Sequence, residues 1–228
     1  MLGIVMEDTN IERIKTAQAL YTKPLLAVYD WLLLGLHCRF IWGCPSHHML
    51  ELYNRYVSAN HLDVGVGTGY FLDHCKFPTA NPRLALMDLN RNCLEVCGKR
   101  LARYKHSVYQ KNVLDPINID TPIDTPGFDS IGMMNLLHCL PGNMKSKGVV
   151  FNNLKALLNP NGVIFGSTFL YGGVQRSLWA TFTLYLTNRL GFMTNREDDM
   201  EGLKTTLAQH FAHSSVQVIG CVGLFAAS

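Results

Sequence analysis

The chain has 228 residues, of which 48% are hydrophobic and 16% are charged, and its formal net charge is +3. This length and apolar content suit one domain with a sizeable core. The small positive charge lacks the dense basic field of nucleic-acid-binding proteins, so we expect no nucleic-acid partner. The cysteines are odd in number and form no CxxC pair. This argues against a zinc site and a disulfide framework, and it favours reduced thiols in a cytoplasmic protein.

The first 60 residues are predicted to be helical. A capping-box spacing predicts a first helix over about 9–21, and Pro24 suits the first turn of a second helix that runs to about residue 42. A third, short helix is predicted over about 45–56. The second helix is apolar on nearly all sides, so we expect it to be covered by protein.

That second helix is also the most apolar stretch of the chain. Asp30, His37 and Arg39 interrupt it, and a membrane span does not tolerate so many polar side chains. We therefore expect a buried helix and no membrane partner. The N-terminus lacks the basic end and the continuous apolar core of a signal peptide, so secretion is not expected.

From residue 61 the pattern changes to short strands that alternate with amphipathic helices, which is typical of a parallel sheet covered on both faces. A helix over about 143–158 is predicted to end in a turn at 159–162. The five predicted strands of this region are 61–66, 83–88, about 107–113, 128–134 and 163–170.

The C-terminal part is predicted to hold two more helices and two strands. Residues 177–190 are amphipathic, and a capping box at 194–197 predicts the start of another helix. Residues 215–227 are predicted to form two short strands joined near Gly220. The apolar stripe of the first segment consists of Trp179, Phe182, Leu186 and Leu190.

The most specific feature is a glycine-rich loop after the first strand. Gly65, Gly67 and Gly69 would let the backbone approach a ligand at the carboxyl edge of the sheet. Asp88 ends the second strand, where a carboxylate can accept both hydroxyls of an adenosine ribose. The GxGxG spacing differs from the GxGxxG of dinucleotide enzymes, and Asp63 just before the loop would repel phosphates. The same carboxylate could orient the ammonium group of a methionine moiety.

Several segments, in this order, resemble the motifs of class I S-adenosylmethionine-dependent methyltransferases. They are LDVGVGTGYFL, LALMDLN, QKNVLDP, FDSIGMMNLLHCL and LLNPNGVIFGST, and they span about residues 61–170. The resemblance implies an α/β, Rossmann-like methyltransferase fold: a seven-stranded, mostly parallel sheet with helices on both faces. Residues 61–228 would form the core, with a lid at about 171–197, and residues 1–60 an N-terminal helical cap of the same domain. The implied cofactor is S-adenosyl-L-methionine.

The resemblance also implies which residues contact this cofactor. Asp63, Gly65 and Gly67 would meet its methionine end, and Asp88 would hold the ribose. Many relatives have an acid where Asn112 stands, which leaves recognition of the adenine amino group open. The remaining contacts would be Leu89 beside the ribose, Asn112 and Val113 at the adenine, and Asn135 under the methionine part. For Leu89, Val113 and Asn135 the alternative is ordinary packing at strand ends.

A weaker resemblance concerns the first 60 residues. YTKPLLAVYDWLLLG followed by FIWGCP is similar to the N-terminal helices of small methyltransferases of microbial secondary metabolism. In such relatives these helices close over the cofactor and shape the acceptor pocket. Tyr21, Tyr29 and Trp42 are therefore candidate substrate-binding residues, and plain core packing is the alternative for each.

No Asp or Glu stands between Asp129 and Glu197. The paired-glutamate loop of arginine methyltransferases and the metal ligands of catechol methyltransferases therefore have no counterpart there, and we expect no metal. The segment Asn135-Leu-Leu-His138 also differs from the Pro-Pro box of nucleic-acid amino-methylating enzymes. His138 is the candidate catalytic residue, as a general base, with a packing role as the alternative.

The sequence thus predicts a metal-independent enzyme that methylates a small, largely apolar or aromatic metabolite. The acceptor would be methylated by positioning, with general-base help from His138. The alternative is a methyltransferase-like pericyclase or binding module that uses S-adenosylmethionine without transferring its methyl group. No oligomeric state is predicted.

Overall fold

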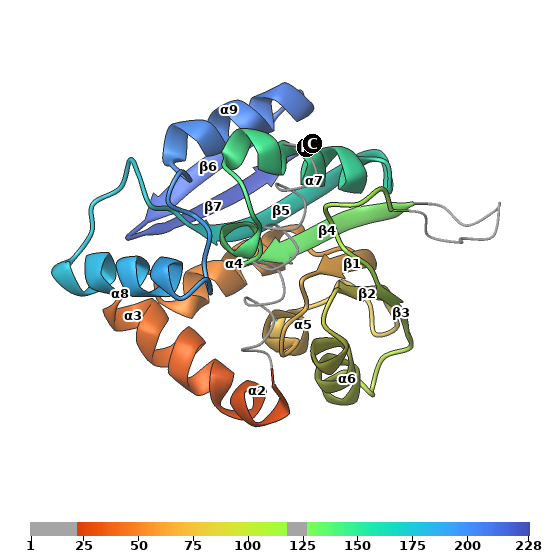
Figure 1. The fold of residues 1–228 in the computed structure, drawn as a ribbon. Helices are drawn as coiled ribbons and strands as arrows, with labels where there is room; N and C mark the ends of the chain where they lie inside the picture. Colours follow the sequence, from red (N-terminus) through yellow and green to blue (C-terminus); the bar gives the residue numbers. More distant parts are fainter. Residues whose placement is uncertain (1–21, 118–126) are drawn as a thin grey trace, which may run out of the picture.

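Within residues 22–117 and 127–228, the part of the chain that the computed structural model describes, seven strands form one sheet (Figure 1). Their order is β3-β2-β1-β4-β5-β7-β6. The first five strands run parallel, and β7 is antiparallel to both β5 and β6. The strands are β1 (Asn60–Val64), β2 (Arg83–Asp88), β3 (His106–Gln110), β4 (Phe128–Met134), β5 (Leu158–Phe169), β6 (Ser214–Ile219) and β7 (Val222–Ala227).

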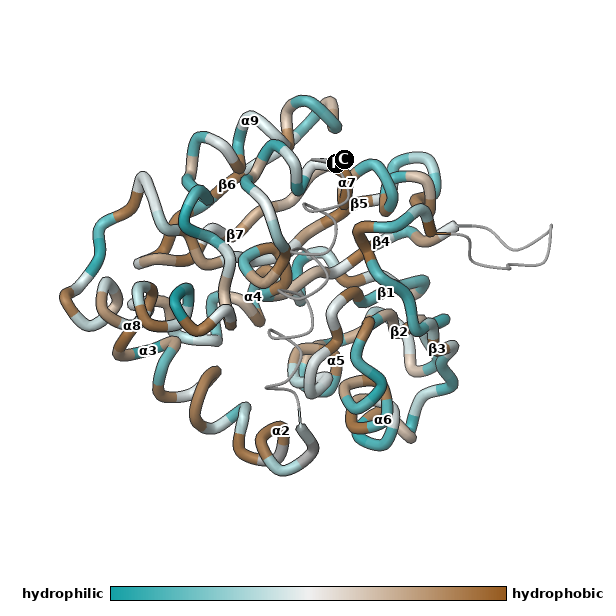
Figure 2. The backbone as a smooth tube through the Cα atoms, in the orientation of Figure 1, coloured by the Kyte–Doolittle hydropathy of each residue, from teal (hydrophilic) through white to brown (hydrophobic). Residues whose placement is uncertain are grey.

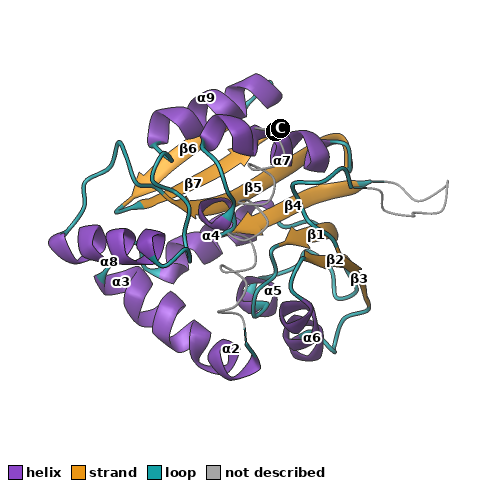
Figure 3. Ribbon diagram, in the orientation of Figure 1, coloured by secondary structure: helices purple, strands orange, loops and turns teal. Residues whose placement is uncertain are grey.

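Helices cover both faces of this sheet (Figure 3). On β2, Leu84 and Leu86 belong to the core that includes α4, α5 and α6, whereas Ala85 and Met87 belong to the core that includes α7 and α9. The helices are α2 (Lys23–Tyr29), the π-helix η1 (Asp30–His37), α3 (Cys38–Phe40), α4 (Ser46–Tyr56), α5 (Tyr70–His74), α6 (Arg91–Arg100), the short 3-10 helix η2 (Leu137–Cys139), α7 (Met144–Lys155), α8 (Leu178–Arg189) and α9 (Met200–His210). The predicted α/β fold is confirmed.

The N-terminal helices pack on one side of the molecule (Figure 1). The helical stretch from α2 through α3 ends at Phe40, close to the predicted end, and its middle part is π-helical. The predicted helix over 9–21 lies outside the described residues. No helix among the described residues has the length and apolar content of a membrane span.

Three predicted strands have different bounds in the structure. β3 ends at Gln110, before the predicted end at 113. β1 ends at Val64, since Gly65 already has a φ of +72°. β5 begins earlier than predicted, at Leu158, because the predicted turn at 159–162 is a bulge within the strand. Its register against β4 shifts there, and Asn161 has a φ of +65°. An asparagine tolerates this left-handed backbone better than most side chains.

The apolar stripe of the segment 177–190 lies on the outside of α8. Trp179 is 71% exposed and Phe182 is 57% exposed, whereas Ala180 and Leu184 form the buried side. Figure 2 shows apolar residues at several points along this helix. Because α8 carries apolar residues on more than one side, helical spacing alone does not select the side that packs inward.

The predicted helix start at Thr194 is wrong. Helix α9 begins at Met200, and the side chain of Asp199 accepts the N–H of Gly202 at 2.6 Å as its cap. Thr194 has a tertiary role instead: its hydroxyl donates to the carbonyl of Leu140, and its N–H donates to the carbonyl of His138. A long-range contact has thus replaced the local capping interaction.

A buried ion pair joins α7 to the segment before α9. Lys147 Nζ lies 2.5 Å from Asp198 Oδ2, and both side chains are fully buried. Burial raises the pKa of Asp198 to about 6, an effect that the charge of Lys147 opposes. Burial likewise lowers the pKa of Lys147, and the carboxylate opposes that shift.

We predict that Lys147→Met lowers the free energy of unfolding by about 3–5 kcal/mol, because it leaves a buried carboxylate without its cation. The double variant Lys147→Met/Asp198→Leu should regain most of this loss, since an apolar pair needs no compensating charge. Urea unfolding of the single and double variants measures both effects. A loss below about 1 kcal/mol in the single variant, the range of a surface pair, would contradict the prediction.

Candidate functional site

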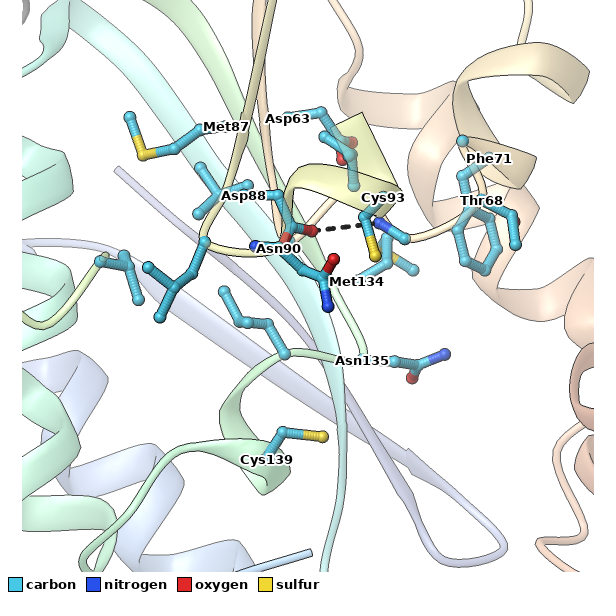
Figure 4. A pocket seen from close by; sticks show the side chains of 18 of the residues that line it. Asp63, Thr68, Phe71, Met87, Asp88, Asn90, Cys93, Met134, Asn135 and Cys139 are labelled. Carbon is cyan, nitrogen blue, oxygen red and sulfur yellow. Dashed lines mark hydrogen bonds between the residues drawn. The ribbon is translucent and has the colours of Figure 1, made fainter. Parts of the chain in front are cut away.

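A cavity lies at the carboxyl ends of β1, β2 and β4 (Figure 4). Its walls come from the glycine-rich loop after β1, the end of β2, the segment 111–113 after β3 and the turn after β4. Tyr29 and Leu34 from the N-terminal helices complete the lining. Open parallel α/β sheets bind their ligands at this edge.

All the residues that the sequence singled out for cofactor contacts line this one cavity. They come from segments far apart in the chain, which the parallel strands bring to the same edge of the sheet. The residues are Asp63, Gly65, Gly67, Asp88, Leu89, Asn112, Val113 and Asn135.

The glycine-rich loop requires glycine for different reasons at its three positions. Gly65, Gly67 and Gly69 all have positive φ values, of 72°, 52° and 76°. A Cβ atom at Gly65 would lie 2.9 Å from Leu136, and one at Gly69 would lie 2.7 Å from the sulfur of Cys97. A Cβ at Gly67 would meet nothing within 4 Å, so the backbone there borders open space. A ligand can approach that backbone closely.

Asp88 lies at the end of β2 and is held by backbone donors. Its Oδ1 accepts the N–H of Asn90 at 2.8 Å, and its Oδ2 accepts the N–H of Gly67 at 3.4 Å. Burial raises the pKa of Asp88 to about 6, although these two N–H groups favour the charged form. The carboxylate of Asp63 raises this pKa further.

Asp63 lies deeper in the cavity, on β1. The hydroxyl of Tyr53 donates to its Oδ2 at 2.5 Å, and the imidazole of His61 lies behind that hydroxyl. Sequence reasoning missed Tyr53 and His61. A signal was present in the strand itself, where two polar residues two positions apart, His61 and Asp63, share one face of an otherwise buried strand.

The N-terminal helices are tied to the glycine-rich loop by polar contacts. The hydroxyl of Thr68 donates to Asp30 Oδ1 at 2.6 Å, and Asp30 Oδ2 lies 2.7 Å from Arg100 Nη2. Arg100 also donates to the carbonyl of Thr68 at 3.1 Å. Asp30 begins the π-helix η1, a kind of irregularity that is frequent at functional sites.

The predicted substrate-binding residues are not all brought together. Tyr29 lines the cavity, whereas Trp42 is buried outside it, with its ring 4.7 Å from that of Phe169. Tyr21 lies outside the described residues. Tyr29 therefore stays a candidate for the acceptor wall, and the position of Trp42 corresponds to the core-packing alternative.

His138 also does not line the cavity. It lies on η2 with its ring against Phe169, and its Nδ1 accepts the N–H of Phe169 at 3.4 Å. Burial lowers the pKa of His138 to about 3, and the nearby charge of Lys147 adds to this effect. In this geometry the imidazole is a weak base that faces the core, which corresponds to the packing alternative.

Several lining residues were not predicted. Cys139 and Leu140, directly after His138, line the cavity, and so does Cys93 on α6 (Figure 4). No group of three or more His, Cys, Asp and Glu side chains within 22–117 and 127–228 could hold a metal ion. The other unpredicted lining residues are Leu34, Val64, Val66, Thr68, Tyr70, Phe71, Leu72, Met87, Asn90, Lys111, Met134 and Leu136.

Comparisons with known proteins agree with this geometry. A family model described as a methyltransferase domain matches residues 62–164. The chain is 38% identical over 216 residues to the demethylluteothin O-methyltransferase of Streptomyces thioluteus, covering 95% of this chain and 92% of that protein. It is 34% identical over 210 residues to the physcion biosynthesis cluster O-methyltransferase of Aspergillus chevalieri, covering 92% and 93%.

Among solved structures, the DhpI–SAH complex has the same fold, with a TM-score of 0.62. Its sequence is 14% identical to this one, and the match covers 93% of this chain and 94% of that chain. The matches to the two named O-methyltransferases extend over nearly the whole chain. The chain therefore belongs to the class I S-adenosylmethionine-dependent methyltransferases, enzymes that use S-adenosylmethionine as their cofactor.

Proposed function

We propose that this enzyme methylates a small, largely apolar or aromatic metabolite, without a metal ion, by holding the acceptor against the cofactor. One observation carries the proposal: a single cavity joins the polar strand ends of the cofactor motifs to an apolar wall. That wall is formed by Tyr29, Leu34, Leu136 and Leu140. The two named relatives are both O-methyltransferases, which supports a metabolite hydroxyl as the acceptor to test first.

The residues present fit S-adenosylmethionine. Open space beside Gly67 accommodates a ligand against the backbone, and the carboxylates of the buried Asp63 and the partly buried Asp88 suit a cation and a ribose diol. In the proposed arrangement Asp63 binds the ammonium group, Gly65 and Gly67 border the methionine part, and Asp88 accepts both ribose hydroxyls. Leu89 would pack beside the ribose, Asn112 and Val113 at the adenine, and Asn135 under the methionine.

When bound, the cofactor supplies a methyl group on a positively charged sulfur. The chain must then place the acceptor atom about 3–3.5 Å from that carbon and in line with the departing sulfur. Tyr29 and Leu34 would form the wall that orients the acceptor and excludes water. Residues 1–60 would act as the cap over this end and residues about 171–197 as its lid. The contacts from Asp30 to Thr68 and Arg100 support the cap assignment, because they join a cap helix directly to the cofactor loop.

The first prediction from this site concerns Asp88. Asp88→Asn should weaken binding of S-adenosylhomocysteine about tenfold or more, because charge-assisted hydrogen bonds contribute roughly 1.5–3 kcal/mol each. The same change should raise the melting temperature at pH 7.5. Because the pKa of Asp88 in the folded protein is raised to about 6 from 3.8, its charge destabilises the fold above that pH. Calorimetry and thermal melts measure the two effects.

The pH dependence of binding gives an internal control. In the wild type, affinity should fall as the pH falls through about 6, where Asp88 gains a proton and can no longer accept both hydroxyls. The Asp88→Asn variant should lack this component. Equal affinity of variant and wild type at pH 7.5 would remove Asp88 from the cofactor site.

The second prediction concerns His138. His138→Asn should leave kcat within about threefold of the wild type, since general-base catalysis typically contributes 10²–10⁴-fold and this imidazole faces the core. Steady-state kinetics at saturating cofactor and a thermal melt provide the comparison. A fall in kcat of about 10²-fold or more with an unchanged melt would instead assign the proton transfer to His138.

The third prediction concerns methyl transfer itself. Incubation with methyl-labelled S-adenosylmethionine and a panel of hydroxylated aromatic and polyene metabolites should give a labelled product, and EDTA should not reduce the yield. Mass spectrometry would detect the product and an equal amount of S-adenosylhomocysteine. Cofactor-dependent isomerisation of a substrate without label would establish the pericyclase alternative instead. Loss of turnover in EDTA, restored by magnesium, would overturn metal independence.

A further inference from the structure

A continuous line of buried polar side chains leads away from Asp63 beneath the cavity. It runs from Asp63 on β1 to Tyr53 on α4, back to His61 on β1, and on to Ser130 on β4. Tyr53, His61 and Ser130 each have a relative exposure of 0%, and that of Asp63 is 5%. Burying so many polar groups is costly unless each is hydrogen-bonded, and in this line each side chain is bonded to the next.

The distances show which group donates each hydrogen bond around Tyr53. The hydroxyl of Tyr53 donates to Asp63 Oδ2 at 2.5 Å and lies 2.8 Å from His61 Nε2. A tyrosine hydroxyl has one proton, so the contact with His61 requires a proton on Nε2 that is donated to Tyr53. On the far side, His61 Nδ1 lies 2.7 Å from Ser130 Oγ, which itself accepts the N–H of Ser58 at 2.9 Å.

Packing holds these groups in place. The ring of Tyr53 is stacked on Phe71 at 5.9 Å and meets the edge of Phe165 at 5.1 Å. Gly132 is the partner of Asp63 in the β1–β4 register, and its lack of a side chain leaves space for the Asp63 carboxylate and the His61 ring. A Cβ at that position would lie 3.1 Å from Asp63 Oδ2 and 3.2 Å from His61 Nε2. The ring contacts therefore fix Tyr53 behind the Asp63 carboxylate, and Gly132 leaves room for that carboxylate.

We propose that Tyr53 and His61 are positioning residues for the amino-acid end of the cofactor. They hold Asp63 through Oδ2, which leaves Oδ1, an atom without a hydrogen bond to the described residues, to accept from the ammonium group in the cavity. A carboxylate fixed in this way binds a cation without first losing rotational freedom. This inference depends on the proposed assignment of Asp63 to the ammonium group, and it assigns to Tyr53 and His61 no direct contact with the cofactor.

The test compares two ligands that differ in the amino-acid end. S-adenosylhomocysteine carries the ammonium group, whereas 5′-methylthioadenosine lacks it and keeps the adenosine. Tyr53→Phe should weaken binding of S-adenosylhomocysteine about tenfold, by loss of one hydrogen bond to a charged group, and change binding of methylthioadenosine less than about twofold. In turnover, KM for S-adenosylmethionine should rise while kcat at saturation stays within about twofold.

A matched control is available on the same helix. Tyr56 lies one turn after Tyr53, and its ring also packs against Phe165, at 5.8 Å. Tyr56→Phe removes a hydroxyl that does not reach Asp63, and it should leave both affinities unchanged. Thermal melts of both variants report any general loss of stability.

A double-mutant cycle separates positioning from a structural role. In an Asp63→Asn background, Tyr53→Phe should add less than about twofold to the loss of S-adenosylhomocysteine affinity, because Tyr53 acts only through the carboxylate. Additive losses, or equal weakening of both ligands, would overturn the inference while leaving the proposed function intact. Failure of the wild type to bind either ligand would overturn the proposed function itself.

A second variant covers the case in which Tyr53→Phe does not fold. Ser130→Ala removes the hydrogen bond at the far nitrogen of His61 and leaves the Tyr53–Asp63 contact in place. It should weaken S-adenosylhomocysteine binding about threefold, and methylthioadenosine binding less than about 1.5-fold, since a neutral hydrogen bond contributes roughly 0.5–1.5 kcal/mol. Unchanged affinity for both ligands in this variant would count against the inference.

Discussion

Two carboxylates, that of the buried Asp63 and that of the partly buried Asp88, lie at neighbouring strand ends, and the need to stabilise them organises the site. Burial raises the pKa of Asp88, and the nearby carboxylate of Asp63 raises it further. Both carboxylates accept hydrogen bonds from the surrounding chain. The N–H groups of Asn90 and Gly67 donate to Asp88, and the hydroxyl of Tyr53 donates to Asp63. A cationic ligand with a ribose diol would satisfy both groups further, which is why the geometry suits S-adenosylmethionine.

The other end of the cavity differs in chemical character. It holds apolar side chains from the N-terminal helices and from the turn after β4, and no carboxylate stands between Asp129 and Glu197. A pocket of this kind orients an acceptor by shape and by exclusion of water. Catalysis would then depend on the alignment of the acceptor with the methyl group, a demand that rigid surroundings meet.

Long-range polar contacts supply part of that rigidity. Asp30, which begins η1, connects the N-terminal helices to the glycine-rich loop, and Lys147 and Asp198 connect α7 to the segment that precedes α9. The first connection reaches the cavity through Thr68, which lines it. In the second, Lys147 donates to the carbonyl of Thr194, whose hydroxyl donates to the carbonyl of the lining residue Leu140. The walls of the site are therefore held by elements that are distant in the sequence.

The sequence by itself determined the α/β class, the succession of strands along the chain, the glycine-rich loop and a set of residues that line one cavity at the strand ends. These follow from short-range signals, since strand and helix periods and a loop motif are local properties. Parallel pairing then places successive strand ends at one edge, so Asp63, Asp88 and Asn135 meet without any further information.

Only the tertiary structure decided which way individual side chains face. Trp179 and Phe182 lie outside because α8 has apolar residues on several sides, and Thr194 serves a contact with Leu140 in place of a helix cap. His138 turns toward Phe169, and Tyr53 reaches Asp63 from a helix that the sequence marked only as a helix. Each outcome depends on packing between segments far apart in the chain. Local sequence patterns do not identify which distant segment a side chain will pack against.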